Sequence, residues 1–505
     1  MKKILFTIGS LFLASTIYAQ NITDALRYGD SDIQGSARFR ALSGAFGALG
    51  GDMSAVSINP AGSAIFNSSH ASFTLGLNGK KNETSFFGTQ NTNKDSNIDL
   101  SQGGAAFVFK HNNEASKFKK FTLGLAYDRT GDFNNNWKAY GNNTNNSIGN
   151  YFLQNAQGLS LDQISAFPGE STSDAYSAIG SAYGSQYQQA YLGYDSYILE
   201  PNTADDDNTL YTSNIAAGNY KQEYSYASTG YNGKLAFNFA TQYTDKFYFG
   251  LNLNSHFLNY ERSTFLFEEN NNGGTIKQVA FQNDLTTIGN GFSFQLGSII
   301  KLSKEVRLGL TYSSPTWYTI EDQTTQSLET LREESGSNLL QIVDPRIVNI
   351  FPRYRLQTPS SFTGSLAYIF GKSGLISFDY GRKNYGNTKF KPKSDAYFSE
   401  QNNTIKDQLT AANTYKIGGE YKINQVSLRA GYRFEESPYK NKTTIGDLSG
   451  YSLGLGYNFG NTKLDLTYDT AQQDRNQSLY NIGLTDAAAL DRKISNITLS
   501  LGFSL

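Results

Sequence analysis

The sequence predicts an all-β fold, a transmembrane antiparallel up-and-down β-barrel of about 14 strands. Three observations predict it. The composition favours strands and turns, apolar residues alternate with polar ones along most of the chain, and the connections between the alternating segments are short and long in turn. The first two also fit a soluble sandwich, so the connections decide between the architectures.

The composition is rich in residues that favour strands and poor in charge. Aromatic residues make up 14% of the 505 residues, glycine outnumbers proline by 48 to 9, and charged residues are 17%. Beyond the N-terminus no run of about 18 apolar residues occurs, which excludes a helical membrane protein. A barrel reconciles a mean hydropathy of −0.46 with a membrane location, because only every second residue of a spanning strand faces lipid.

Charge and cysteine content exclude several classes of function. The 43 basic and 44 acidic residues give a net charge of −1, so nothing in the overall charge indicates nucleic acid or an anionic membrane surface as a partner. Cysteine is absent, which excludes disulfides, thiolate metal sites and cysteine nucleophiles.

The chain begins like an exported protein. Lys2 and Lys3 precede an apolar stretch from Ile4 to Leu13, and small residues lead to Ala19. This pattern predicts a signal peptide over residues 1–19, cleaved near Ala19.

From His70 onward the dominant hydrophobic period is two, as in strands with one apolar face. Phe247, Phe249, Leu251 and Leu253, for example, alternate with polar or small residues. The predicted strands cover residues 70–79, 98–110, 118–128, 229–241, 246–260, 288–301, 304–313, 359–370, 374–381, 413–421, 425–434, 449–459, 462–469 and 494–505.

Short and long connections alternate strictly, as in outer-membrane barrels. The short ones cover 111–117, 242–245, 302–303, 371–373, 422–424 and 460–461, and we place them with both termini in the periplasm. Residues 130–228 then form an unusually long extracellular loop. Helical spacing around Ser173–Leu192 suggests that this loop is a partly folded lid.

Two further patterns agree with a barrel. Aromatic residues near the predicted strand ends form candidate interfacial girdles, namely Phe73, Tyr127, Tyr260, Tyr312, Tyr380 and Tyr468. The last strand carries apolar residues on one face up to Phe503 and Leu505, an ending that suits the machinery that inserts barrels. A single chain of this size closes by itself, so we expect a monomer.

Residues 20–68 precede the barrel and do not alternate. The stretch 35–52 is packed with small residues, including Gly44, Gly47 and Gly50, which allow close approach to a surrounding wall. A short helix is then expected to end at Asn59-Pro60-Ala61-Gly62, because the residue before proline avoids the α region.

This block resembles the N-terminal hatch of the long-chain fatty acid channel family of outer-membrane transport proteins, the FadL and TodX type. The stretches around Leu428–Tyr432 with Ser437-Pro438, Thr358-Pro359 to Asp379-Tyr380, and Leu308-Gly309 with Tyr312 strengthen the resemblance, which spans most of the chain from about Ala37. The long loop 130–228 departs from the family pattern.

The resemblance implies a hatch over residues 20–68 that plugs the lumen of a barrel formed by residues 69–505. It implies passive transport of hydrophobic small molecules, by default long-chain fatty acids, across the outer membrane of a Gram-negative bacterium. Haem and aromatic hydrocarbons would fit an apolar groove equally well. The implied gate residues are Asn59, Pro60, Ala61, Gly62, Gly44, Gly47 and Gly50. Phe39, Phe46 and Phe66 are candidates for lining an apolar pocket. The structural alternative is a permanent plug whose aromatic residues only pack.

Catalysis, cofactors and metals are not expected. A lipid hydrolase would need a serine beside a histidine, and of the three histidines His70 and His111 lie at a strand start and in a turn, while His256 faces the lumen. Glycines 44, 47 and 50 lack the βαβ context of a nucleotide fingerprint. Asp205–Asn208 lacks the spaced carboxylates of a calcium loop.

One alternative class of function stays open. A porin, or a surface receptor or adhesin, could use the barrel only as a scaffold and the long loop as the binding element. The expected partners are a hydrophobic ligand, outer-membrane lipid with lipopolysaccharide, and the insertion machinery.

Overall fold

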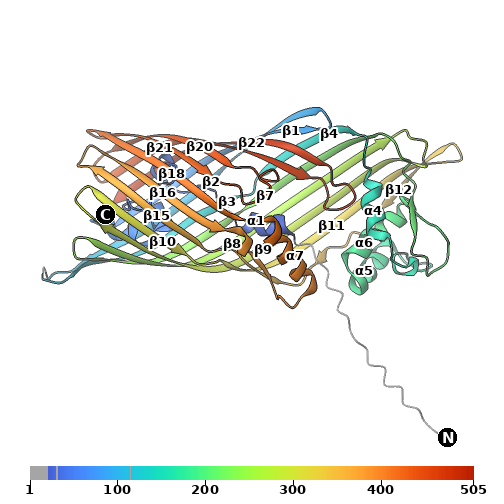
Figure 1. Cartoon of the computed structure of the whole chain (residues 1–505), viewed down its shortest axis with the longest axis horizontal. Helices are drawn as coiled ribbons and strands as arrows, with labels where there is room; N and C mark the ends of the chain where they lie inside the picture. Colours follow the sequence, from blue (N-terminus) through green and yellow to red (C-terminus); the bar gives the residue numbers. More distant parts are fainter. Residues whose placement is uncertain (1–20, 30–31, 114) are drawn as a thin grey trace, which may run out of the picture.

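The computed structural model describes residues 21–29, 32–113 and 115–505 (Figure 1). The signal peptide expected over residues 1–19 lies outside these residues. None of the described helices is long and apolar enough to cross a membrane.

Fourteen antiparallel strand positions close into a barrel, which confirms the predicted fold class. The seam is formed by β1 and β22, which pair from His70↔Ser504 to Ser85↔Ala489. The strands are β1 (His70–Phe86), β2 (Thr89–Lys110), β3 (Phe118–Asp132), β7 (Tyr220–Tyr243), β8 (Phe247–Asn270), β9 (Ile276–Lys301), β10 (Val306–Ser313) with β11 (Trp317–Glu334), β14 (Tyr354–Gln357) with β15 (Ser361–Phe370), β16 (Gly374–Asn384), β18 (Ala411–Ile423), β19 (Val426–Glu435), β20 (Leu448–Asn458), β21 (Thr462–Ser478) and β22 (Ala487–Ser504).

Two neighbouring positions are each split in two. β10 and β11 are separated around Pro315, and β14 and β15 around Pro359. Proline has no N–H to give to a ladder, so it interrupts a strand. The wall stays joined there because Thr358 N–H donates to Thr316 O at 3.0 Å and Ser314 N–H donates to Phe294 O at 2.9 Å.

The wall is incomplete between β2 and β3. Ser101 is an extra residue in β2, since Thr74 pairs with Gln102 and Leu75 with Leu100. β2 pairs with β3 only from Gln102 to Lys110, and among the described strands its first half pairs only with β1. Above Gln102 the ladder is replaced by side chains, where Arg129 of β3 forms ion pairs with Asp99 of β2 and with Asp132.

The strands run further outward than predicted. β3 continues to Asp132, β4 (Asn135–Asn143) pairs with β7, and β7 begins at Tyr220, so the connection covers 144–219 and not 130–228. Above the membrane both faces of a strand meet water or the cap, so the lipid-facing apolar period that marks a spanning strand is absent there.

Residues 144–219 fold into a compact extracellular cap, seen at the right of Figure 1. Its elements are α4 (Ile148–Ala156), η2 (Leu161–Gln163), α5 (Thr172–Tyr183), α6 (Ser185–Asp195), β5 (Leu199–Pro201) and β6 (Tyr211–Ser213). Phe152, Ile179 and Tyr191 of its helices share a buried cluster with Phe281 and Leu328 of the extended strands. The helical spacing around 173–192 therefore corresponds to α5 and α6.

Other connections build the rest of the extracellular end. They contain β12 (Ser337–Val343), β13 (Asn349–Ile350), η3 (Tyr385–Asn387), β17 (Lys389–Lys391) and α7 (Ala396–Gln408). Phe398 and Ile405 of α7 pack in a second buried cluster that also holds Leu26 and Tyr28 of α1 (Ile22–Gly29).

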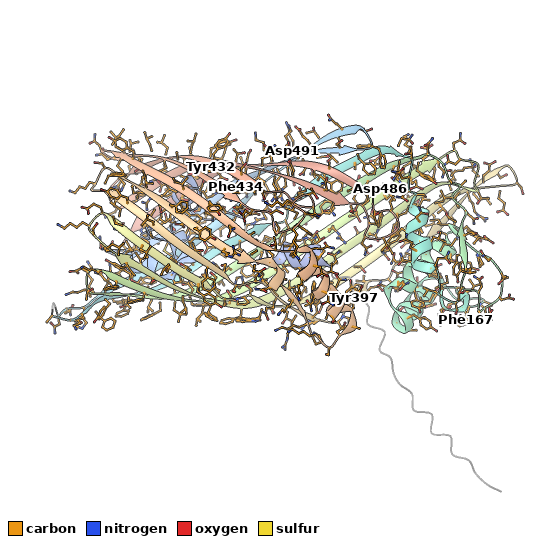
Figure 2. All side chains as sticks on the ribbon, viewed as in Figure 1. Phe167, Tyr397, Tyr432, Phe434, Asp486 and Asp491 are labelled. Carbon is orange, nitrogen blue, oxygen red and sulfur yellow. The ribbon has the colours of Figure 1, made fainter. Side chains whose placement is uncertain are left out.

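The outer wall carries the exposed apolar band that a lipid-facing surface requires. Tyr432, labelled in Figure 2, stands on this face of β19 and is 48% exposed. Tyr260 does not belong to a girdle, contrary to the prediction. It is 1% exposed and packs inside against α1, because it shares the parity of Asn252, Asn254 and His256.

The segment before β1 lies inside the barrel. After α1 it forms α2 (Ala37–Ala41), α3 (Met53–Ile58) and η1 (Pro60–Ile65). α2 contacts β19 to β22, α3 contacts β2 and β3, and η1 contacts β3 and β7 to β9. Because these strands lie on different sides of the barrel, the segment fills the lumen; we call residues 32–66 the plug.

Candidate functional site

Glycines of the wall receive the plug at close range. A Cβ on Gly309 would lie 2.3 Å from the carbonyl oxygen of Gly47, and one on Gly297 would lie 2.0 Å from Asn59 Oδ1. Any larger side chain would have to displace the plug. The other glycines of this ring are Gly250, Gly418, Gly431 and Gly454.

Asn59 fastens the plug where the sequence predicts its turn. Its Nδ2 donates to Gly47 O at 2.7 Å and to Ser298 O of β9 at 2.9 Å, while Oδ1 accepts from Ala61 N–H. Asn238 of β7 donates to Pro60 O at 3.0 Å. The predicted gate turn is therefore buried and bonded to two strands.

The predicted glycines of the plug have distinct roles. Gly44 and Gly50 adopt φ of 78° and 65°, a region that favours glycine. Gly47 N–H donates to Asp379 of β16 at 2.9 Å, and a Cβ on Gly47 would lie 2.1 Å from Ser365 Oγ. Gly62 O accepts from Gly51 N–H.

Two arginines of α2 tie the plug to acidic wall residues. Arg38 Nε donates to Glu420 Oε2 at 2.8 Å, and Arg40 donates to both carboxylate oxygens of Asp469 at 2.8 and 3.1 Å. Burial alone would lower the pKa of the Arg38 guanidinium, but the Glu420 carboxylate outweighs burial and raises it. Buried ion pairs of this kind fix the position of the plug, since removing one partner would leave the other charge buried without a counter-charge.

A cavity of about 330 Å³ lies between the plug and the wall. Its lining is largely polar and charged, including Asp128, Lys234, His256, Asp379 and Lys416. His256 bonds Ser293 Oγ at 2.8 Å. We call it the lower cavity; its walls suit water and polar groups far better than an acyl chain.

A second cavity of about 170 Å³ lies beside α1, toward the cap, and we call it the upper cavity. Its lining combines two chemical types. Apolar and aromatic surface comes from Leu26, Phe133, Trp137, Tyr226, Tyr260 and Leu490. Positive charge comes from Arg27, Lys80, Arg475 and Arg492.

Asp32 of the plug borders both cavities. Burial alone would raise the pKa of the Asp32 carboxyl, but Lys80, Arg492, the Asp132 N–H and Arg433 together lower it. Asp32 also accepts from Asp132 N–H at 3.3 Å. A carboxylate of the chain itself thus lies in the positive field of the upper cavity.

The three predicted lining phenylalanines are distributed differently. Phe39 borders the lower cavity. Phe46 packs fully buried in the plug core with Leu42 and Leu49, and Phe66 stacks on His70 with ring centroids 4.8 Å apart. The sequence did not predict which residues line the upper cavity. The inward parity that places His256 in the lumen could have identified Tyr260, but not the packing of α1 beside it.

Within the described residues no group of three or more histidines, aspartates or glutamates could hold a metal ion. Asp205–Asp207 lie exposed on the cap.

A family model described as outer membrane protein transport protein (OMPP1/FadL/TodX) matches residues 203–500. A FadL homologue from Pseudomonas aeruginosa is 12% identical with a TM-score of 0.55, over 94% of this chain and 99% of that one. The toluene transporter TodX of Pseudomonas putida is 14% identical with a TM-score of 0.52, over the same shares. No curated protein matches the sequence.

Proposed function

The chain belongs to the outer membrane protein transport family (OMPP1/FadL/TodX), which carries hydrophobic compounds across the outer membrane, and on that premise we propose that its ligand is a long-chain fatty acid admitted past an N-terminal hatch. The observation that carries the proposal is the mixed lining of the upper cavity. A fatty acid has the same two parts, an apolar chain and one carboxylate.

The aromatic side of the upper cavity would shield part of the acyl chain, with a gain of about 0.8 kcal/mol for each buried CH₂ group. The carboxylate would face Lys80, Arg475 and Arg492. A neutral aromatic hydrocarbon such as toluene would bury its ring but would make no electrostatic use of these cations, of which Lys80 already pairs with Asp132 at 3.1 Å. The positive charge therefore favours an anionic amphiphile over a neutral hydrocarbon.

The hatch would be gated at Asp32 and its neighbours Ile33 and Gln34. Asp32 lies between the cavities, in the field that a ligand carboxylate would occupy. Asn59, Pro60, Ala61 and Gly62, with Gly44, Gly47 and Gly50, would hold the rest of the plug against the wall while this segment rearranges.

We further propose that the ligand leaves through the wall between β2 and β3. The lower cavity is polar, whereas the wall above Gln102 is bridged by the Arg129–Asp99 ion pair and not by a backbone ladder. Side chains can separate without breaking strand pairing, so opening a route to the lipid here needs less free energy than opening a hydrogen-bonded part of the wall.

The test is uptake of labelled oleate and labelled toluene into vesicles that contain the purified barrel, beside a sugar-swelling assay. We expect oleate uptake without sugar flux, and loss of oleate uptake in the Asn59→Ala/Pro60→Ala variant. Toluene uptake with no oleate uptake would replace the ligand class. Sugar flux would indicate a porin, and absence of all uptake would favour a receptor or adhesin.

The exit route has its own variant. Asp99→Asn leaves Arg129 paired with Asp132 but replaces the ion pair to β2 by a weaker neutral hydrogen bond, so oleate uptake should rise about tenfold if opening limits the rate. Asp95→Asn, on the same strand, is the matched control. An unchanged rate in Asp99→Asn would argue for release into the periplasm.

A further inference from the structure

The near-neutral net charge of the chain hides two oppositely charged ends. The cap, residues 144–219, contains eight acidic residues and no basic one. At the other end, each of the six short turns carries or adjoins a lysine: Lys117, Lys246, Lys304, Lys372, Lys422 and Lys463.

Four of these lysines stand in the turns themselves and are exposed, namely Lys117, Lys246, Lys304 and Lys372. None of the four forms an ion pair within the described part of the chain. By sequence the turns also contain three acidic residues, Glu114, Asp245 and Glu305. The four turn lysines therefore leave the turns a net charge of +1, and Lys422 and Lys463 at the adjoining strand ends are further cations.

The lysines adjoin the lower edge of the lipid-facing band. Large apolar side chains beside the turns are exposed, namely Phe118, Leu302, Phe370, Ile423, Phe459 and Leu505. Such residues mark the boundary between hydrocarbon and headgroups. A lysine ammonium next to them reaches the depth of the lipid phosphates.

We propose that this lysine ring binds anionic phospholipid headgroups of the periplasmic leaflet. The cations are distributed around the whole circumference, one turn after another, and a leaflet is the anionic surface that meets all turns at once. An acidic protein partner would call for a patch on one side. Each lysine near an anionic leaflet contributes modestly, so the ring acts through its number.

The proposal does not depend on the identity of the transported ligand, and its test uses no transport. The barrel is equilibrated with equal amounts of phosphatidylglycerol and phosphatidylethanolamine, and bound lipids are counted by native mass spectrometry. We expect phosphatidylglycerol to be preferred, and the preference to fall at least about tenfold in Lys117→Gln/Lys246→Gln/Lys304→Gln/Lys372→Gln.

The matched control removes four exposed lysines of the opposite end, Lys94→Gln/Lys393→Gln/Lys406→Gln/Lys442→Gln, and should keep the preference. Heat-modified mobility verifies that both variants fold. Equal binding of the two lipids by the unaltered protein overturns the proposal, as does an equal loss in both variants. Raising salt on the unaltered protein gives a second measurement, because screening should abolish the preference.

Discussion

Asp32 interacts with the same cations that a ligand carboxylate would bind. Its carboxyl group borders both cavities and has its pKa lowered, against the effect of burial, by Lys80 and Arg492. A side chain of the plug thus neutralises part of the positive charge of the upper cavity before any ligand arrives. Binding an anionic ligand would require Asp32 to move or to share its cations.

Replacing Asp32 by asparagine should therefore strengthen oleate binding, by about threefold to tenfold, because the competing charge is removed while the shape is kept. Trp137 lines the upper cavity and is one of two tryptophans, so its fluorescence in a Trp317→Phe background reports binding. Asp205→Asn on the cap is the control. Weaker binding in Asp32→Asn would mean that the carboxylate helps to build the site.

Gly309 gives a second prediction at this scale. Gly309→Ala places a methyl group 2.3 Å from Gly47 O and should destabilise the folded barrel by about 1–3 kcal/mol. The measurement is the urea midpoint of refolded protein. Gly364→Ala on β15 is the matched control, since nothing lies within 4 Å of its Cβ. Equal urea midpoints for Gly309→Ala and Gly364→Ala would show that the plug moves aside without loss of stability.

The sequence identified one half of this contact. The run of small residues in 35–52 predicted close approach, and the turn at Asn59-Pro60 was located correctly. The complementary wall glycines were not singled out, because glycine is also common in strands and turns of any barrel. Which glycine faces the plug depends on strand pairing, which a single sequence does not specify.

Among the elements, the cap depends on a buried carboxylate of β8. Glu268 accepts from Ile148 N–H at the start of α4 at 2.8 Å, from Ser147 Oγ, and from Gln222 Nε2 at 2.8 Å. It is fully buried. Three donors of cap and wall therefore converge on one side chain.

Glu268→Ala should loosen the cap, since it leaves these donors without a partner at a cost of about 1–3 kcal/mol each. Hydrogen exchange over 148–195 should accelerate, while exchange in the barrel strands stays slow. Glu261→Ala, exposed on the same strand, is the control. Unchanged protection of α4 would show that the apolar cluster alone holds the cap.

The strands illustrate what periodicity can and cannot predict. Their periplasmic ends agree with the predicted ones to within a few residues, because exposed apolar residues alternate up to the short turns. Their outer ends lie beyond the predicted ones, by as much as 21 residues in β11 and 12 in β9, because the alternation ends where lipid ends. The cap helices were indicated by spacing alone, and their packing on the extended strands was not predictable.

For the whole molecule, the plug should determine whether the barrel conducts. The wall behind it is lined by polar groups such as Asn238, Asn252 and Arg429. Deleting residues 21–66 should therefore leave a water-filled pore, seen as a large steady conductance in planar bilayers. Asn59→Ala/Pro60→Ala, which keeps the plug, is the control and should conduct far less. A silent deletion variant that is correctly folded would mean that the cap closes the channel.

The close fit of the plug has a consequence for the order of assembly. Ala37 N–H donates to Ser500 of β22 and Thr467 of β21 donates to Ala37 O, while η1 rests on β7 to β9 across the lumen. Because the plug contacts the wall on opposite sides of the lumen, at glycines that leave no room for a Cβ, threading this segment into a finished cylinder would be sterically hindered. The plug must therefore be in place inside the growing sheet before the last strand, β22, pairs with β1. The seam then closes around the plug.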